Sequence, residues 1–214
     1  MQSGVDAWKL GDFDAAVRYW MPVANSGNAD AQFNMGQAFK LGRGVVTSLA
    51  DAEIWYRRAA EQGHLQAEDN LGLTLFTMGK REEAMPYIRR SAARGEARAQ
   101  FLLGTAHYNG DLAEKDWPRA YALIQRASET GLSLAKSRIV ELDRLIPAEQ
   151  RNMGFAMLPQ MRRAEEAARL AALPNSDATP ASAKPAPATM ARSSVAPPQP
   201  LQMISLPASD LSAS

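Results

Sequence analysis

No cysteine occurs in the 214-residue chain, which excludes disulfide bridges, thiolate nucleophiles and cysteine-ligated zinc or iron–sulfur sites. An excess of charge is also lacking, because 24 basic residues stand against 23 acidic ones. Nucleic-acid-binding domains usually carry a basic excess or stripe, so we expect no nucleic-acid partner. No apolar run approaches the roughly 20 residues that span a bilayer, so no transmembrane segment is expected.

Catalytic and metal-binding patterns are sparse as well. The chain has two histidines. His64 precedes Glu68 by four residues, a spacing open to two metal ligands on a helix, but a histidine in a surface turn is the favoured interpretation. His107 occupies a position that is aromatic in another copy of the repeat described below (Phe39), which indicates a partly buried packing residue. No nucleophile stands at a motif-like spacing from either histidine, so we predict no catalytic residue, metal site or cofactor.

What the sequence does contain is an internal repeat. Four glycines, spaced 36, 32 and 36 residues apart, each close a stretch of the same pattern: Gly27, Gly63, Gly95 and Gly131. Glycine suits the left-handed residue that ends a helix, because it has no Cβ. The four stretches are therefore predicted to be helices, called second helices below, and they span 13–27, 49–63, 81–95 and 117–131.

The second helices share three columns when they are aligned on their glycines. The columns recur at roughly i, i+3 and i+7, which is one face of an α-helix. Small residues in the first and third columns let a neighbouring helix approach, and larger side chains in the second fill the gap. The first column is Ala16, Ala52, Ala84 and Ala120; the second is Tyr19, Trp55, Tyr87 and Leu123; the third is Val23, Ala59, Ser91 and Ala127.

A different helix follows each of these glycines, beginning near residues 31, 67, 99 and 135; these are called first helices. Three of them carry a glycine in the middle (Gly36, Gly72 and Gly104), where the fourth has Val140. A mid-helix glycine costs about 1 kcal/mol relative to alanine. Its recurrence therefore indicates that the first helix crosses the following second helix closely, so that the two form a pair. Longer connections within pairs are expected at 42–48 and 110–116.

The stretch 31–72 reads A-x3-M-G-x2-F-x2-G-R-G-V…A-x2-W-x2-R-A-A-E-Q-G-x3-A-x3-L-G. It resembles the Sel1-like repeat, a relative of the tetratricopeptide repeat, and the resemblance covers roughly residues 4–146. It departs from the family pattern at His107 and at Ser48, where an aromatic and an acidic residue are usual. The resemblance implies an all-α fold, a right-handed α/α solenoid of about four repeats with a C-terminal capping helix. Family members are typically non-enzymatic adaptors, which implies a protein or peptide partner.

Two further segments are expected after the solenoid of residues 1–146. Pro147 and Glu149 predict the start of a helix over 147–172, with a bend expected at Pro159. This helix is predicted to cap the last repeat; alternatively it binds a partner or dimerises. Residues 174–214 hold eight of the thirteen prolines and only four charges, so 173–214 is predicted to be a disordered Pro/Ala/Ser-rich tail.

The location is predicted from the chain ends. Residues 1–8 show neither the basic region nor the apolar stretch of a signal peptide, which favours the cytoplasm by default, or the periplasm if a leader has been removed. The layout of repeats followed by a Pro/Ala-rich segment resembles bacterial cell-envelope proteins that end in a peptidoglycan-binding SPOR domain. No SPOR domain follows here, so the resemblance implies only an envelope context in bacteria.

The candidate binding site lies on the first helices, which line the concave surface in related repeats. Positions one turn apart would form a groove with an aromatic floor and polar edges, suited to an extended peptide or a helix. Alternatively, Phe33 and Phe101 are core residues between adjacent pairs. The predicted groove residues are Phe33, Gln37, Lys40, Asp69, Leu73, Phe76, Phe101, Thr105 and Tyr108.

Two functions stay open at this point. The first is a non-enzymatic adaptor that binds a partner on the concave face, and it is favoured because no catalytic constellation is found. The alternative is an envelope hydrolase or a cell-wall (peptidoglycan) associated protein. A set of arginines on the second helices is compatible with an anionic partner, but a solvated face is the favoured interpretation. These arginines are Arg57, Arg58, Arg89, Arg90 and Arg126.

Overall fold

The computed structural model describes residues 1–171, which form ten α-helices and no strand, so the predicted all-α fold is confirmed. The predicted tail at 173–214 lies outside the described residues. None of the helices within residues 1–171 is both long and apolar enough to cross a bilayer. The helices are α1 (Gln2–Lys9), α2 (Phe13–Asn25), α3 (Ala29–Leu41), α4 (Leu49–Ala60), α5 (Leu65–Thr77), α6 (Arg81–Ala93), α7 (Ala97–Asn109), α8 (Trp117–Glu129), α9 (Ser133–Leu145) and α10 (Ala148–Ala171).

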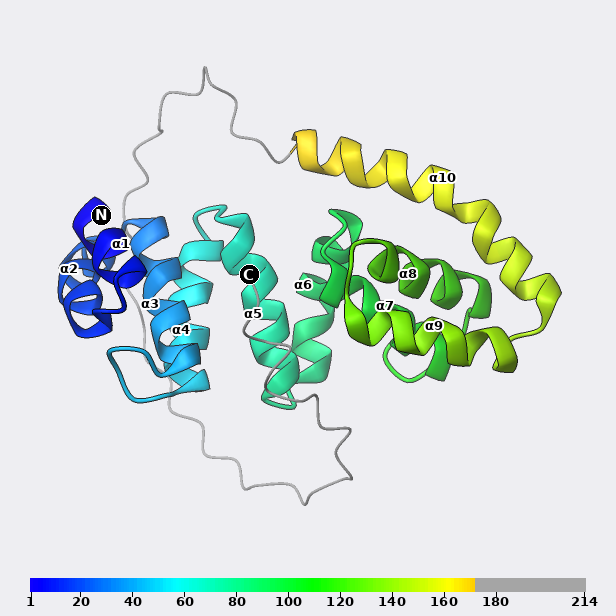
Figure 1. Cartoon of the computed structure of the whole chain (residues 1–214), viewed down its shortest axis with the longest axis horizontal. Helices are drawn as coiled ribbons and strands as arrows, with labels where there is room; N and C mark the ends of the chain where they lie inside the picture. Colours follow the sequence, from blue (N-terminus) through cyan, green and yellow to red (C-terminus); the bar gives the residue numbers. More distant parts are fainter. Residues whose placement is uncertain (172–214) are drawn as a thin grey trace. The chain divides into compact units, whose positions relative to one another are not determined.

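Each helix from α1 to α8 packs against the next one along the chain (Figure 1). The predicted pairs are α3 with α4, α5 with α6 and α7 with α8, and α1 with α2 makes an earlier pair of the same kind. The first helices of neighbouring pairs also touch, α3 with α5 and α5 with α7. This succession of helix pairs, each in contact with its neighbours, is the arrangement of a solenoid.

The helix ends follow the predicted chemistry. The glycines that close the second helices all have a left-handed φ, as predicted: Gly27 at 98°, Gly63 at 84°, Gly95 at 85° and Gly131 at 98°. At the other end, short polar side chains accept a hydrogen bond from the third backbone N–H beyond them: Asp12 for α2, Asn28 for α3, Ser48 for α4 and Asp116 for α8. These caps satisfy N–H groups that have no partner inside the helix.

The mid-helix glycines lie where the two helices of a pair cross, which confirms the prediction. A Cβ added to Gly36 would lie 2.5 Å from the ring of Tyr56, and one added to Gly104 would lie 2.7 Å from Ile124. Gly4 in α1 has the same role, because its Cβ would lie 2.3 Å from Trp20. The sequence analysis did not identify Gly4 as a member of this series.

The alanine column is fully buried in all four second helices, as its small size predicts. The expectation that the next column fills the core is wrong for Tyr19, which is 52% exposed. This column faces the preceding pair, since Tyr87 on α6 accepts a hydrogen bond from Arg57 on α4 (3.2 Å). Among the described helices only α1 precedes α2, so Tyr19 has no preceding second helix to contact. The bulky side chains buried in every second helix stand one position later: Trp20, Tyr56, Ile88 and Ile124.

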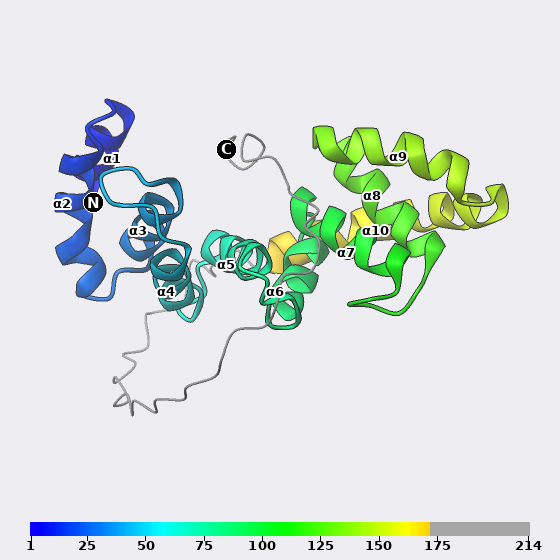
Figure 2. The same cartoon turned by 90° about the horizontal axis from the view of Figure 1, so that it is seen from below.

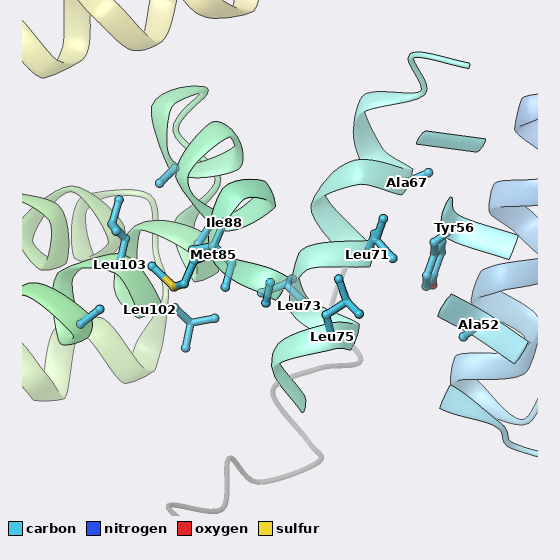
Figure 3. Close-up of a cluster of buried hydrophobic side chains, with 14 of the residues drawn as sticks. Ala52, Tyr56, Ala67, Leu71, Leu73, Leu75, Met85, Ile88, Leu102 and Leu103 are labelled. Atoms are coloured by element: carbon cyan, nitrogen blue, oxygen red, sulfur yellow. The ribbon is translucent and has the colours of Figure 1, made fainter. Parts of the chain in front are cut away.

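The largest buried cluster of hydrophobic side chains spans α4 to α8. Figure 3 shows how α5 joins two neighbouring pairs. Leu71 and Leu75 lie on its side toward Tyr56 of α4, whereas Leu73 lies on the side toward Met85 of α6. The core is therefore continuous between these pairs, and α5 is buried on both flanks.

The last helix, α10, turns back and packs along α8 and then α6 (Figures 1 and 2). It is a single 24-residue helix with Pro159 inside it. Gly154 allows the close approach, since a Cβ there would lie 2.7 Å from the carbonyl oxygen of Pro118. Leu158 and Glu165 are buried on this face, whereas Leu170 is 60% exposed.

Candidate functional site

The nine predicted groove residues all lie on α3, α5 and α7, and the side formed by these three helices is called the first-helix face. Their burial differs. Leu73 is 6% exposed and Phe101 is 9% exposed, and both belong to the hydrophobic core between pairs. The remaining seven are half-buried: Phe33, Gln37, Lys40, Asp69, Phe76, Thr105 and Tyr108.

The aromatic rings of the predicted floor pack against the protein itself. Phe33 stacks on the imidazole of His64, with ring centroids 4.7 Å apart. Tyr108 stacks on Trp117 at 6.4 Å, and Phe76 packs against the core cluster. These rings therefore hold neighbouring helices together, so much of their surface is unavailable to a ligand.

Asp69 points toward its own pair. Its carboxylate accepts hydrogen bonds from the hydroxyl of Ser91 and from the guanidinium of Arg94, both at 2.5 Å, and both donors belong to the α6 side of the pair. The same guanidinium contacts Glu68 at 2.8 Å. These partners neutralise Asp69 and direct its carboxylate toward α6.

The polar members of the prediction that come together are Gln37 and Lys40. The hydroxyl of Tyr56 donates to Oε1 of Gln37 (2.6 Å), and Nζ of Lys40 donates to Oδ1 of Asn70 (3.1 Å). Nδ2 of Asn70 donates to a carbonyl oxygen in its own helix (2.8 Å). The hydroxyl of Thr105 donates to the backbone carbonyl of Phe101 in its own helix (2.9 Å) and is therefore used within α7.

The electrostatics of this cluster are set by burial and by a neighbouring arginine. Burial, together with the positive charge of Arg98 and against the opposing effect of Glu96, lowers the pKa of Lys40 to about 8. Burial also raises the pKa of Tyr56, against the effect of Arg98. The charge of Arg98, a residue of α7, therefore acts on both side chains. We call Gln37, Lys40, Asn70 and Arg98 the donor cluster.

Asn70 and Arg98 were missed by the sequence analysis, which followed one stripe along each first helix. Asn70 aligns with Leu102 of α7, a buried apolar residue. A polar residue at a position that is apolar and buried in another copy was a usable signal. Arg98 gave none, because its proximity to Lys40 depends on how two pairs stack.

Three of the five second-helix arginines, Arg57, Arg90 and Arg126, form ion pairs with carboxylates of the same chain. Of the other two, Arg58 lies over the ring of Trp55 and Arg89 donates to the carbonyl oxygen of Leu112. Arg57 contacts Glu53 at 2.9 Å and Glu83 at 2.7 Å, and Lys80 contacts Glu53 at 2.6 Å. Burial alone would raise the pKa of Glu53, but hydrogen bonds from Lys80 and Arg57 outweigh it and hold the pKa below its ordinary value. Arg90 likewise contacts Glu68 at 2.5 Å. The half-buried arginines of the second helices, Arg57 and Arg126, are therefore paired within the chain.

The two histidines have structural partners. Nδ1 of His64 accepts from the backbone N–H of Ala67 (3.1 Å) and so caps α5, while Nε2 faces Asp30 at 3.4 Å. His107 is 6% exposed, as predicted for a packing residue, and its Nδ1 contacts the carbonyl oxygen of Glu114 (2.8 Å). His107 thereby anchors the loop at 110–116. Among residues 1–171, no three His, Asp or Glu side chains gather in a way that could hold a metal ion.

A second candidate site is an apolar hollow of about 250 Å³ between α6, α8 and α10. Its walls include Leu103, Leu123 and Met161. Polar contacts of α10 close one end, because Glu165 accepts hydrogen bonds from Gln100 (2.7 Å) and from Arg126 (2.6 Å). The hollow therefore depends on how α10 docks.

Comparison with known proteins identifies the repeat unit. The Sel1 repeat family model matches residues 29–64 and 97–132, which are the pairs α3–α4 and α7–α8. A curated relative, the mouse protein named DAP3-binding cell death enhancer 1, is 29% identical, and the match covers 64% of this chain and 34% of that protein. The chain thus spans about a third of the length of this relative.

Two solved structures have a similar fold. A Sel1 repeat protein from Oxalobacter formigenes has a TM-score of 0.60 and 24% identity, and the match covers 76% of this chain and 71% of that one. A protective antigen of uropathogenic Escherichia coli strains, described as displaying an SLR fold, has a TM-score of 0.54 and 25% identity, and the match covers 79% of this chain and 46% of the other. Both similarities support a solenoid of Sel1-like repeats.

Proposed function

The chain belongs to the Sel1 repeat family, and on that premise we propose that it is a non-enzymatic scaffold that binds a protein or peptide partner on its first-helix face. Sel1 repeats are generally protein-interaction modules. Stacked repeats of this kind present extended surfaces, and such surfaces suit an extended peptide or a helix. The proposal therefore specifies which surface binds.

A single asymmetry between the two sides of the solenoid supports this choice. On the second helices, the half-buried arginines Arg57 and Arg126 are paired with carboxylates of the chain itself. On the first helices, Gln37 accepts a hydrogen bond from Tyr56 and Lys40 donates one to Asn70, and no carboxylate among residues 1–171 forms an ion pair with Lys40. A half-buried cation without a carboxylate partner favours a ligand, because a charge partly withdrawn from water is usually paired.

The relatives leave the organism and the compartment open. They include a mouse protein as well as bacterial structures. The bacterial cell-envelope location therefore stays a prediction from the layout of the sequence, and the scaffold proposal does not depend on it.

Affinity capture with matched variants tests the proposal. The full chain is immobilised as wild type, as a Gln37→Ala/Lys40→Ala variant and as an Arg58→Ala/Arg89→Ala control on the second helices, and captured proteins are quantified by mass spectrometry. We expect at least one protein held by both wild type and control to fall about tenfold or more on the Gln37/Lys40 variant. Equal capture by all three proteins contradicts the proposal. Circular dichroism verifies that each variant is folded.

A further inference from the structure

Lys40 is an exception among the half-buried cations of residues 1–171. Seven lysine and arginine residues in this range are half-buried, and all except Lys40 form an ion pair with a carboxylate of the chain. The six paired residues are Arg57, Arg94, Arg98, Arg126, Arg138 and Arg151. A cation withdrawn from water is usually paired, so the missing partner of Lys40 needs an explanation.

The groups around Lys40 offer donors, since their acceptors are already occupied. Oδ1 of Asn70 accepts from Lys40 itself, and Oε1 of Gln37 accepts from the hydroxyl of Tyr56. The ammonium of Lys40 has three N–H donors and the amide of Gln37 has two, so both keep donors for a ligand. Such a set matches an acceptor with several lone pairs, which a carboxylate provides.

The carboxylate of Glu96, whose charge acts on Lys40, is hydrogen-bonded to groups other than Lys40. Its Oε1 accepts from Nε of Arg98 at 2.9 Å, and its Oε2 accepts from the backbone N–H of Ala99 at 2.6 Å, so that it caps α7. Glu96 therefore fixes Arg98 beside the cluster and does not form an ion pair with Lys40. The two cations come from different pairs, α3 and α7, with Asn70 of α5 between them in the chain.

We propose that the donor cluster binds the carboxylate side chain of an acidic peptide segment, with Lys40 and Gln37 as the contacting residues. The inference rests on the proposed function, because it assigns the chemistry of the partner to that same face. Charge-assisted hydrogen bonds to a carboxylate are stronger than those between neutral groups. The bound carboxylate completes the ion pair that Lys40 lacks within residues 1–171.

Binding of two defined peptides tests this inference. The probes are fluorescein-labelled octaglutamate and octaglutamine with blocked termini, titrated at low ionic strength with the full chain and followed by fluorescence anisotropy. We expect octaglutamate to bind at least tenfold more tightly than octaglutamine. Lys40→Met should weaken octaglutamate binding about tenfold or more, because it keeps the apolar stem and removes the charge. The matched control is Arg18→Met, which removes one exposed cation from α2 and should change binding less than about twofold.

Nonspecific attraction between octaglutamate and the cations of the chain would not distinguish Lys40 from Arg18. Equal losses of octaglutamate affinity in Lys40→Met and Arg18→Met, or no loss in Lys40→Met, overturn the inference. NMR of the Lys40 side chain gives a second readout: bound octaglutamate should raise the pKa of Lys40 from about 8, and an unchanged pKa also overturns the inference. If capture of the partner is still lost in the Gln37→Ala/Lys40→Ala variant but octaglutamate does not bind the wild-type chain, the acidic-peptide inference is wrong and the scaffold proposal stands. If the Gln37→Ala/Lys40→Ala variant captures as much partner as the wild type does, the scaffold proposal fails.

Discussion

At the scale of single residues, packing reverses the usual effect of a helix glycine. Replacing a mid-helix glycine by alanine normally stabilises a helix by about 1 kcal/mol. At Gly36 the added Cβ would lie 2.5 Å from the ring of Tyr56, which is fully buried and held by Gln37. We expect Gly36→Ala to lower the free energy of unfolding by about 2 kcal/mol, because the ring cannot move aside without strain.

Urea unfolding of a double-mutant cycle checks this prediction. In a Tyr56→Ala background the cost of Gly36→Ala should fall to less than half, since the ring that clashes is gone. A stabilising effect of Gly36→Ala in the wild-type background would show that the two helices do not cross as closely as described.

His64 caps α5 although it is neither serine, threonine, aspartate nor asparagine. His64→Ala removes the acceptor for the N–H of Ala67 and the ring that stacks on Phe33, so the free energy of unfolding should fall by about 1 kcal/mol or more. His64→Asn restores the acceptor and should recover part of the loss. Thermal unfolding compares the two variants, and equal midpoints would rule out a capping role.

Lys40 is expected to cost stability at neutral pH. Its pKa in the folded protein is about 8, below the ordinary value of 10.5, so the folded state disfavours the charged form. The charge is present in both states below pH 8, where the cost is full. Between pH 8 and 10.5 the unfolded chain binds more protons than the folded one, and stability rises with pH.

Replacing Lys40 by methionine should therefore stabilise the protein at pH 7 by about 1 kcal/mol, allowing for the lost hydrogen bond to Asn70. Urea titrations at pH 7 and at about pH 10 should show the advantage shrinking at the higher pH, where the wild-type side chain sheds its proton. A variant that is less stable than wild type at pH 7 would indicate that Lys40 has a structural role.

At the scale of helices, α10 is held by a few polar contacts at its C-terminal half. Glu165 is 4% exposed and binds Gln100 and Arg126, while Leu158 is the only large apolar side chain of α10 that is buried in the described helix. Removing one partner of a buried ion pair leaves the other uncompensated, which is strongly destabilising. The docking of this half of α10 should thus depend on Glu165.

Glu165→Ala is expected to raise amide hydrogen exchange about tenfold or more over residues 160–171, with little change in α1 to α5. Arg162→Ala is the matched control, because Arg162 is exposed and contacts only Glu129. Exchange that rises equally in both variants, or across the whole solenoid, contradicts a local role of Glu165 in holding the C-terminal half of α10 in place.

The sequence predicted the helices and their crossings within a pair better than the contacts between neighbouring pairs. Helix ends and crossings followed from local chemistry, since Gly27 needs a left-handed φ and Gly36 a close neighbour. The exposure of Tyr19 depended on which pair precedes α2, and the place of Arg98 beside Lys40 depended on the stacking of pairs. A single sequence carries the period of a repeat but contains no direct record of such lateral contacts.

At the scale of the whole described molecule, the two sides of the solenoid differ in how charge is used. The second helices connect neighbouring pairs by ion pairs such as those of Arg57 with Glu83 and of Lys80 with Glu53. The first helices leave a half-buried cation, Lys40, without a carboxylate among residues 1–171. This difference is the basis for assigning partner binding to the first-helix face.

The footprint of a bound partner tests that assignment most directly. Hydrogen–deuterium exchange is measured on the full chain alone and with the partner obtained by affinity capture. We expect added protection in α3, α5 and α7, centred on the segments that carry Gln37, Lys40 and Asn70, and we expect Lys40→Met to lose this protection. Protection confined to α4, α6, α8 or α10, with none on the first helices, would contradict that assignment.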